Sequence, residues 1–308
     1  MYIINKMIVL ILRGGLGNQM FEYAAAKSMA LRAHTEVILN TSLGFATDYE
    51  FHRKFCLDCF SLSYSKNRLL SFDFIGGHFF EALSRKLGFH VLAPHYKVIN
   101  DTNTDVADLK NNPSKYKNVL LTGTWNGTDD YFNDMFETIK IEFNLIWDLP
   151  PLVKQYEELI HLSIKPVVAV GIRLFQEVKN GSKSPDSQKA PEADYIHGAL
   201  EWYNRNFGDV KFLVFTQVKD WFLNNIQTEI FDFEFVDTYT DDSTAIFDMY
   251  LFSICDHYIL TNSTFYAWGE KLGRNSNKCV VIPDNWNLST NKSWIKLSKC
   301  NEDSASIY

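Results

Sequence analysis

The sequence lacks both an excess of basic residues and a long apolar run. Its 308 residues include 30 Lys and Arg against 37 Asp and Glu, giving a formal net charge of −7. Nucleic acid and anionic membranes are therefore poor default partners. The apolar run at residues 8–12 is too short to span a bilayer, and Arg13 with glycines follows it instead of a signal-peptide cleavage site. We expect a cytoplasmic protein without an integral membrane segment.

Motifs that bind metals are also scarce. The chain has 5 cysteines, of which Cys56 and Cys59 have CxxC spacing, but no second CxxC or histidine pair accompanies them. This favours a reduced pair in the core over a zinc site. An Asp-x-Asp motif, which could hold a divalent metal at a diphosphate, is missing, and Asp232-Phe233-Glu234 is a near variant. We therefore expect no bound metal.

The most informative motif present is Arg-Gly-Gly-Leu-Gly-Asn-Gln at residues 13–19. A β-branched apolar run precedes it at residues 8–12, and a helix-forming run follows from about residue 19 to residue 33. Gly14 and Gly15 permit positive φ and let another molecule approach the backbone closely. The helix start offers unpaired N–H groups and a partial positive charge. This order predicts a phosphate-bearing ligand near the turn.

Two common nucleotide motifs do not fit this turn. A dinucleotide fingerprint needs a third glycine and an acidic residue roughly 20 residues later. Met20 stands in place of that glycine, and the next strand-like run ends at Asn40. A Walker A motif also fails, because no Gly-Lys-Ser/Thr follows. Asn18 either caps the helix or contacts a ligand, and a dinucleotide oxidoreductase stays open on the glycine turn alone.

The second half of the chain alternates between strand and helix patterns. Strand signals lie at residues 167–172, 212–216, 233–236, 257–261 and 279–282. This βαβ rhythm predicts a doubly wound parallel sheet, whose ligands bind beyond the carboxyl ends of the strands. The polar helix start at residues 262–265 lies at such an end and could hold a second phosphate.

In both halves of the chain, therefore, a predicted strand is followed directly by a helix that begins with polar residues. We expect an α/β protein of GT-B type, with two Rossmann-like domains that face each other across a cleft, the scaffold of many sugar-nucleotide transferases. Breaks at Pro150-Pro151 and Lys165-Pro166 mark the boundary region. We assign residues 1–155 to an N-terminal domain and residues 156–308 to a C-terminal domain.

Several blocks, in order along most of the chain, resemble the α-1,2-fucosyltransferases of glycosyltransferase family 11. The opening block, Arg-Gly-Gly-Leu-Gly-Asn-Gln-Met-Phe-Glu-Tyr-Ala at residues 13–24, and the block at residues 262–268, similar to the family's Asn-Ser-Thr-Phe-Ser-Trp-Trp, are specific. Supportive matches are Leu-Thr-Gly-Thr-Trp at residues 121–125 with Tyr131-Phe132, Phe-Thr-Gln at residues 215–217 with Trp221, Asp248 to Leu251, and Pro283 with Trp286.

One block departs from the family pattern. The family usually carries His-x-Arg-Arg-Gly-Asp-Tyr after the first strand of the donor domain. Here Gly171 replaces the histidine, Arg173 matches the first arginine, and Leu174 replaces the second. The missing charge motivates an alternative function, a non-catalytic or weakly active homologue that binds a nucleotide sugar or a glycan.

The resemblance implies an inverting galactoside 2-α-L-fucosyltransferase that is independent of metal and of any cofactor. GDP-fucose would be the donor, bound by the C-terminal domain. The acceptor would be a galactose-containing oligosaccharide or a lipid-linked unit of a bacterial O-antigen or capsule, held by the N-terminal domain. For a lipid-linked acceptor the protein would act peripherally at the inner membrane face.

The candidate site residues lie at the predicted strand ends. Bond breakage leaves negative charge on the diphosphate, which we assign to Arg173 and to helix-start N–H groups. Asn18 would orient the leaving-group oxygen or the acceptor hydroxyl, and Glu22, one helical turn later, is the candidate base. Asp248 would accept hydrogen bonds from the guanine base. The donor-binding candidates are Gly14, Gly15, Gln19, Thr216, Gln217, Asp248, Asn262, Ser263, Thr264 and Phe265.

Overall fold

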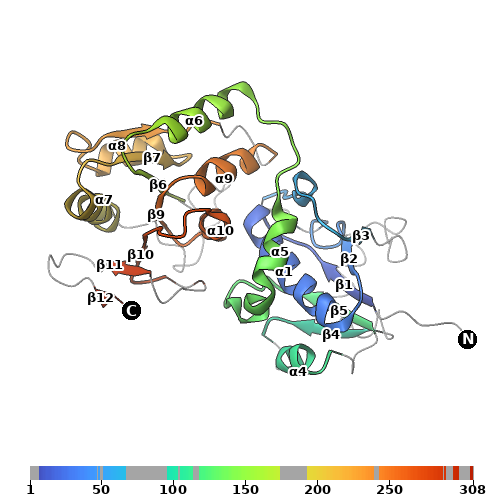
Figure 1. Cartoon of the computed structure of the whole chain (residues 1–308). Coiled ribbons are helices and arrows are strands. Elements are labelled where there is room, and N and C mark those ends of the chain that lie inside the picture. Colours follow the sequence, from blue (N-terminus) through green and yellow to red (C-terminus); the bar gives the residue numbers. More distant parts are fainter. Residues whose placement is uncertain are drawn as a thin grey trace, which may run out of the picture. The chain divides into compact units, whose positions relative to one another are not determined.

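The computed structural model describes residues 7–46, 48, 51–66, 96–102, 105–113, 118–173, 193–238, 243–286, 288, 294–297 and 306–307. The chain divides into two compact units, Met1–Trp147 and Asp148–Tyr308, and each holds its own largely parallel sheet (Figure 1). The division falls ahead of helix α6 (Pro151–Leu162), whereas the sequence places it between residues 155 and 156, inside this helix.

The described part of the first unit contains a parallel sheet with strand order β3-β2-β1-β5-β4. The strands are β1 (Met7–Ile11), β2 (Val37–Asn40), β3 (Ser65–Lys66), β4 (Lys97–Asn100) and β5 (Asn118–Thr122). Strand β1 lies at the centre, and Val9 and Leu10 are completely buried. A continuous apolar run suits such a strand because both faces of a parallel sheet are covered.

Helix α1 (Leu16–Ala33) is the long helix of the first unit, and most of its residues are buried. It ends at His34, which adopts a left-handed conformation and donates its N–H to the carbonyls of Ala30 and Leu31. The other helical segments among the described residues of this unit are η1 (Leu57–Cys59), α4 (Asp105–Asn111), η4 (Asp129–Tyr131), η5 (Asn133–Met135), α5 (Phe136–Lys140) and η6 (Ile141–Phe143).

The second unit has a sheet with strand order β12-β11-β10-β9-β6-β7-β8 among its described residues, and only the pair β11–β12 is antiparallel. The strands are β6 (Val167–Gly171), β7 (Lys211–Phe215), β8 (Phe233–Phe235), β9 (His257–Ile259), β10 (Val280–Pro283), β11 (Ile295–Leu297) and β12 (Ser306–Ile307). Strands β6 to β10 confirm the five strands expected in this half. The helices are α6, α7 (Ala193–Phe207), α8 (Lys219–Asn225), α9 (Ala245–Ser253) and α10 (Thr264–Leu272).

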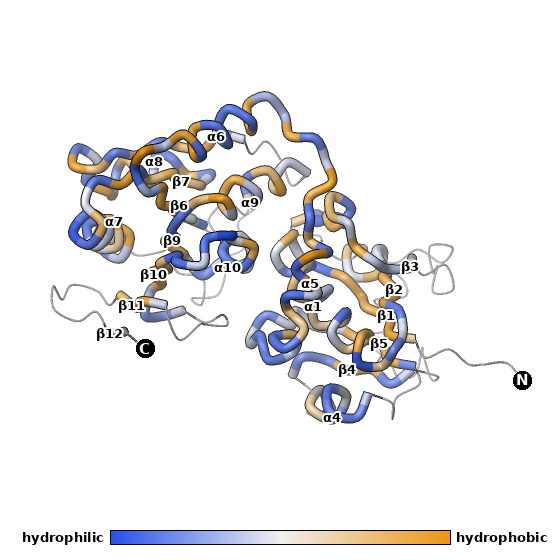
Figure 2. Tube along the Cα trace, in the orientation of Figure 1, coloured by the Kyte–Doolittle hydropathy of each residue, from blue (hydrophilic) through white to orange (hydrophobic). Residues whose placement is uncertain are grey.

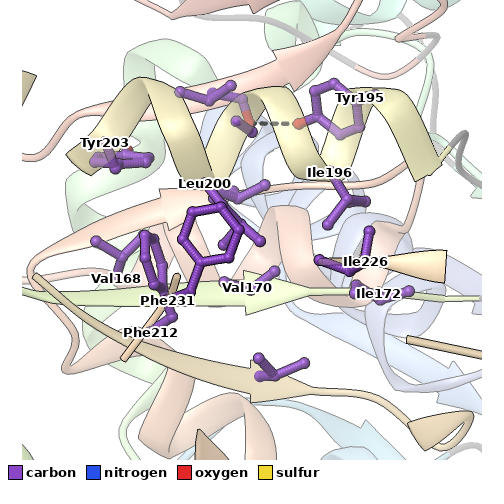
Figure 3. Packing of buried hydrophobic residues seen from close by; sticks show 14 of the residues in the cluster. Val168, Val170, Ile172, Tyr195, Ile196, Leu200, Tyr203, Phe212, Ile226 and Phe231 are labelled. Atoms are coloured by element: carbon purple, nitrogen blue, oxygen red, sulfur yellow. Dashed lines mark hydrogen bonds between the residues drawn. The ribbon is translucent and has the colours of Figure 1, made fainter. Parts of the chain in front are cut away.

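Helix α7 packs on the second sheet through a buried apolar cluster. Ile196 and Leu200 of α7 meet Val168, Val170 and Phe212 of the sheet (Figure 3). Two buried tyrosines of the same helix also reach backbone carbonyls next to the strands, because a buried phenol needs a hydrogen-bond partner. The hydroxyl of Tyr195 lies 2.7 Å from Leu260 O, and that of Tyr203 lies 2.8 Å from Cys279 O.

Helix α9 is apolar along most of its length (Figure 2). A helix that is apolar on all sides is usually buried in the core. Eight of the nine residues of α9 are buried. Asp248 is the acidic residue in its first turn, and it is buried as well. A buried carboxyl in an apolar helix must be satisfied by a specific partner. Among the described residues, no helix has the length and apolarity to cross a membrane.

Gly44 packs against the backbone directly before the glycine turn. A Cβ on Gly44 would lie 1.9 Å from Leu12 O and 2.9 Å from Leu12 C, so the backbone must move to admit one. We expect Gly44→Ala to lower the free energy of unfolding by about 1–3 kcal/mol, measured by urea denaturation. Gly127→Ala is the matched control, because a Cβ there meets nothing within 4 Å. Equal stabilities of the two variants would contradict the prediction.

Candidate functional site

The glycine turn of the first unit follows strand β1 as the sequence predicts. Gly14 has a φ of +71°, the left-handed region that favours glycine. Gly15 is the N-cap residue of α1, so Asn18 lies inside the first turn of the helix, and the capping alternative for Asn18 is wrong. The partly exposed Asn18 side chain lies against Gly14, where a Cβ would meet its Nδ2 atom at 2.7 Å.

Gln19 ties the turn to a distant segment of the first unit. Its side chain is completely buried. The Nε2 atom donates to Gly14 O at 2.9 Å and to Lys54 O at 2.8 Å, and Oε1 accepts from the N–H of Cys56 at 2.9 Å. The same segment brings the guanidinium of Arg53 to 3.9 Å from the Cβ position of Gly15. The sequence offers no local signal for this cation, because 38 positions separate the two residues.

Glu22 is completely buried in α1, behind the glycine turn. One carboxylate oxygen, Oε2, accepts from the N–H of Arg13 at 2.9 Å. The other, Oε1, has no hydrogen-bond partner within the described residues. Burial raises the pKa of Glu22 well above its usual range, the N–H and charge of Arg13 oppose this rise, and the nearby charge of Asp101 adds to it. A raised pKa makes the ionised carboxylate a stronger proton acceptor.

Asp101 and Trp125 form a second feature at the same edge of the sheet, which sequence reasoning did not assign to the site. Asp101 follows β4, and its Oδ2 accepts from the backbone N–H groups of Thr124 and Trp125 at 3.1 and 3.0 Å. Trp125 is completely buried and has a φ of +54°, which is unusual for a bulky residue. The only sequence signal was the Leu-Thr-Gly-Thr-Trp block at residues 121–125.

In the second unit Arg173 follows strand β6. Its backbone N–H donates to the hydroxyl oxygen of Thr261 at 3.2 Å, and the Thr261 hydroxyl donates to Gly171 O at 2.9 Å. Thr261 follows β9, the neighbour of β6 in the sheet. The hydroxyl of Thr261 therefore holds the backbone at Gly171 and at Arg173, on either side of Ile172, and fixes the end of β6 to the end of β9.

Helix α10 begins at the same edge. Ser263 is its N-cap residue, but its side chain makes no capping hydrogen bond. Thr264 and Phe265 follow in the first turn, and both are half-buried. The Asn262 side chain donates from Nδ2 to Asn285 O at 3.0 Å. The first-turn N–H groups of α10 lie at the helix end that favours an anion.

The other donor-binding candidates are Thr216 and Gln217, which follow β7, and Asp248, which lies in the first turn of α9. Thr216 directly follows β7, and its hydroxyl oxygen accepts from the N–H of Val218 at 3.2 Å, while Gln217 is exposed. The Thr238 hydroxyl donates to Oδ1 of the buried Asp248. Burial raises the pKa of Asp248 to about 6, the Thr238 hydrogen bond opposes this rise, and the charge of Asp237 adds to it.

The structure therefore brings the second-unit candidates to one edge of one sheet. Strands β9, β6, β7 and β8 are consecutive neighbours, and all are parallel. Arg173, the start of α10, Thr216 and the Thr238–Asp248 pair thus follow the carboxyl ends of adjacent strands, where α/β sheets bind ligands. Gly14, Gly15, Asn18, Gln19 and Glu22 gather at the end of β1 in the first unit. Residues 174–192, with the remainder of the departing block, lie outside the described residues.

In the part of the chain that the structure describes, acidic and sulfur ligands do not gather in a metal-binding arrangement. Within the described ranges, no group of three or more His, Cys, Asp or Glu side chains could hold a metal ion. Neither Cys56 nor Cys59 forms a disulfide; Cys59 is buried, as expected for a core pair, whereas Cys56 is only half-buried.

The chain is similar in sequence to known glycosyltransferases. The model of the family "Glycosyl transferase family 11" matches residues 115–301. The chain is 26% identical over 310 residues to the O-antigen biosynthesis glycosyltransferase WbnK of Escherichia coli, covering 93% of this chain and 99% of that protein. It is 24% identical to an α-1,2-colitosyltransferase of Escherichia coli, covering 91% of this chain and 92% of that protein.

Solved structures of fucosyltransferases share the fold. A mutant of Arabidopsis thaliana FUT1 in complex with GDP matches with a TM-score of 0.55 at 14% identity, covering 90% of this chain and 70% of that chain. The fucosyltransferase NodZ from Bradyrhizobium matches with a TM-score of 0.52 at 13% identity, covering 87% of this chain and 92% of that chain. The α/β fold of GT-B type that the sequence predicts is thereby confirmed.

Proposed function

The chain belongs to glycosyltransferase family 11 and is a fucosyltransferase-like glycosyltransferase, and from this premise we propose that it transfers fucose from GDP-fucose to the 2-hydroxyl of a terminal galactose-type residue. The acceptor oxygen attacks C1 of fucose, and the bond from C1 to the β-phosphate oxygen breaks. The electron pair of that bond leaves with GDP, and the anomeric configuration inverts. The hydroxyl proton passes to a base, for which we propose Glu22, reached through one water because its carboxyl is completely buried.

The observation that carries this proposal is the placement of Arg173 beside the start of α10. Both follow the ends of neighbouring strands, and Thr261 connects them through the backbone of Gly171 and Arg173. A departing diphosphate gains negative charge as the C1–O bond lengthens. A guanidinium and oriented helix-start N–H groups stabilise that charge without having to reorganise.

The remaining second-unit candidates suit the nucleoside part of the donor. A guanine base presents its N1–H and its amino group side by side, and an ionised carboxylate can accept from both. We propose Asp248 for this role, with Thr238 holding one of its oxygens in place. Thr216 and Gln217 would contact the ribose or the base.

In the first unit we propose Asn18 and the glycine turn as contacts for the leaving-group oxygen or the acceptor hydroxyl. Asn18 is partly exposed, so its amide can reach a ligand. Gln19 has a different character, because its amide already bonds three backbone groups. We expect its contribution to come from the shape it gives the turn.

A second donor is favoured by one relative. Colitose is fucose without its 3-hydroxyl, and the α-1,2-colitosyltransferase of Escherichia coli is 24% identical to this chain. A chain of this family could therefore use GDP-colitose for the same α-1,2 transfer. The two donors differ at one hydroxyl, so a direct competition between them is informative.

The test uses the purified full chain with radiolabelled GDP-fucose and a panel of galactose-terminated acceptors that differ in the penultimate sugar. We expect transfer with and without EDTA, because the proposed mechanism uses no metal, and a 2-linked product identified by NMR. GDP-colitose and GDP-mannose are the competing donors. GDP binding without transfer to any acceptor would support the non-catalytic alternative. Binding of NADH with no response to GDP would support an oxidoreductase.

A further inference from the structure

The end of strand β6 has no room for a side chain at residue 171. A Cβ built on Gly171 would lie 2.4 Å from Cγ of Tyr266 and 2.7 Å from both of its Cδ atoms. Distances below 3.0 Å essentially never occur for real Cβ atoms. The aromatic ring of Tyr266 therefore fills the volume that a side chain at residue 171 would need.

Tyr266 is also anchored on the opposite side. Its hydroxyl donates to Phe215 O, the last carbonyl of β7, at 2.7 Å. The same carbonyl accepts from the N–H of Ile172 at 3.0 Å. The ring is buried and packs against Phe252, with 5.1 Å between ring centroids. Because one aromatic ring packed on both Gly171 and Phe252 has little freedom to move, its place in the site is fixed.

These contacts connect the two parts of the proposed diphosphate site. Tyr266 is the third residue of α10, so it shares the first turn with Thr264 and Phe265. Gly171 lies two residues before Arg173. The ring of Tyr266 thus sets the distance between the start of α10 and the backbone that carries Arg173.

Resting on the proposed function, we propose that Tyr266 is a positioning residue of the donor site, which holds Arg173 and the first turn of α10 in register for a nucleoside diphosphate. Both positions depart from the family blocks quoted above, with Gly171 in place of histidine and Tyr266 in place of serine. The contact between the two side-chain positions explains why both differ: a large residue at one requires glycine at the other.

The first test is a double-mutant cycle between Tyr266→Ser and Arg173→Ala, read as GDP affinity by calorimetry. In the parent protein we expect Arg173→Ala to weaken GDP binding about 30-fold, because it removes a charge-assisted contact. In the Tyr266→Ser background the same change should cost about threefold or less, because the guanidinium is no longer held in register. If Tyr266 only stabilises the fold, Arg173→Ala should weaken GDP binding by the same factor with and without Tyr266→Ser. That result would overturn the proposal.

The second test concerns the steric contact. Gly171→Ala should weaken GDP binding about tenfold in the parent, since either the ring or the end of β6 must shift. It should change the affinity by less than about twofold once Tyr266→Ser has removed the ring. An equal effect in both backgrounds contradicts the proposal. If Tyr266→Ser does not fold, Tyr266→Leu serves as the background in both cycles.

Tyr203→Phe is the matched control for Tyr266→Phe. Each loses a buried hydroxyl that donates to the backbone, but Tyr203 reaches Tyr258 O in the middle of β9 and Cys279 O directly before β10, whereas Arg173 follows the end of β6. We expect similar losses of thermal stability, with a rise in KM for GDP-fucose only for Tyr266→Phe. Equal KM values contradict the proposal.

The tests separate the two proposals. If the parent protein does not bind GDP at all, the proposed function fails. If it binds GDP but the double-mutant cycles show independent effects, only the role of Tyr266 is overturned.

Discussion

Replacing Arg173 with alanine should lower kcat/KM for GDP-fucose about 10²- to 10³-fold. A preorganised donor aimed at developing charge typically contributes about 3–4 kcal/mol to the transition state. Arg173 occupies the end of β6, and its backbone is fixed by Thr261, so the side chain starts from a defined position. Steady-state kinetics with a galactose-terminated acceptor measures the effect.

Two further variants show whether the loss comes from the guanidinium itself. Arg173→Lys keeps the charge but loses the planar fork of donors, so we expect an intermediate rate. Arg205→Ala removes an exposed arginine from helix α7 of the same unit, and its kinetics should match those of the parent. A fully active Arg173→Ala protein would remove the central support for the proposed diphosphate site.

The sequence was sufficient for strands β6 to β10 and their carboxyl ends, whereas it did not predict β3, β4, β11 or β12. Buried parallel strands are continuous apolar runs, so residues 167–172 and 257–261 were recognisable without any knowledge of their neighbours. Polar residues that follow such runs necessarily lie at one edge of the sheet. That rule alone placed Arg173 and the start of α10 at the same edge.

Contacts between residues distant in the sequence were not predictable in this way. Gly171 and Tyr266 touch across 95 positions, and neither carries a local pattern that identifies the other. Gln19 looked like a ligand contact because it is polar and lies beside glycines. Its role in tying down Lys54 and Cys56 depends on the path of a segment that no periodicity specifies.

The start of α1 shows a subtler limit. Leu16 and Gly17 gave no helix signal, because a glycine-rich turn and a helix start share the same residues. The helix nevertheless begins at Leu16 and is capped by the backbone of Gly15. This places Asn18 in the first turn and Glu22 about one turn deeper, which separates a partly exposed amide from a buried carboxyl.

Replacing Asp248 with asparagine should produce two effects of opposite sign, on nucleotide affinity and on stability. Guanine donors need an ionised acceptor, and hydrogen bonds to a charged group contribute about 1.5–3 kcal/mol. We therefore expect Asp248→Asn to weaken GDP binding by about 10- to 150-fold at pH 8. Asp220→Asn, which changes an exposed carboxyl on helix α8, is the control and should leave the affinity unchanged.

The pH dependence follows from the raised pKa of Asp248. The pKa of Asp248 is about 6 in the folded protein, against 3.8 for an unperturbed aspartate. Below pH 6 the carboxyl is therefore largely protonated and cannot accept from both guanine donors. GDP affinity should fall about tenfold per pH unit below this value, and Asp248→Asn should remove that dependence. Calorimetric titrations between pH 5 and pH 8 measure both curves, and parallel curves for the two proteins would contradict the role of Asp248.

The free energy of unfolding of Asp248→Asn at pH 8 should rise, although its affinity for GDP falls. Because the pKa is higher in the folded protein than in the unfolded chain, the protonated carboxyl favours folding below about pH 4, and this contribution is lost as the pH rises through about 6. At pH 8 the ligand-free protein therefore holds an ionised, buried carboxylate at a cost of about 2–3 kcal/mol. The asparagine side chain keeps an acceptor for the Thr238 hydroxyl without that charge, so the variant should be more stable than the parent at pH 8 and no more stable at pH 4. A variant that loses both GDP affinity and stability at pH 8 would mean that Asp248 supports the packing of α9 and not the nucleotide.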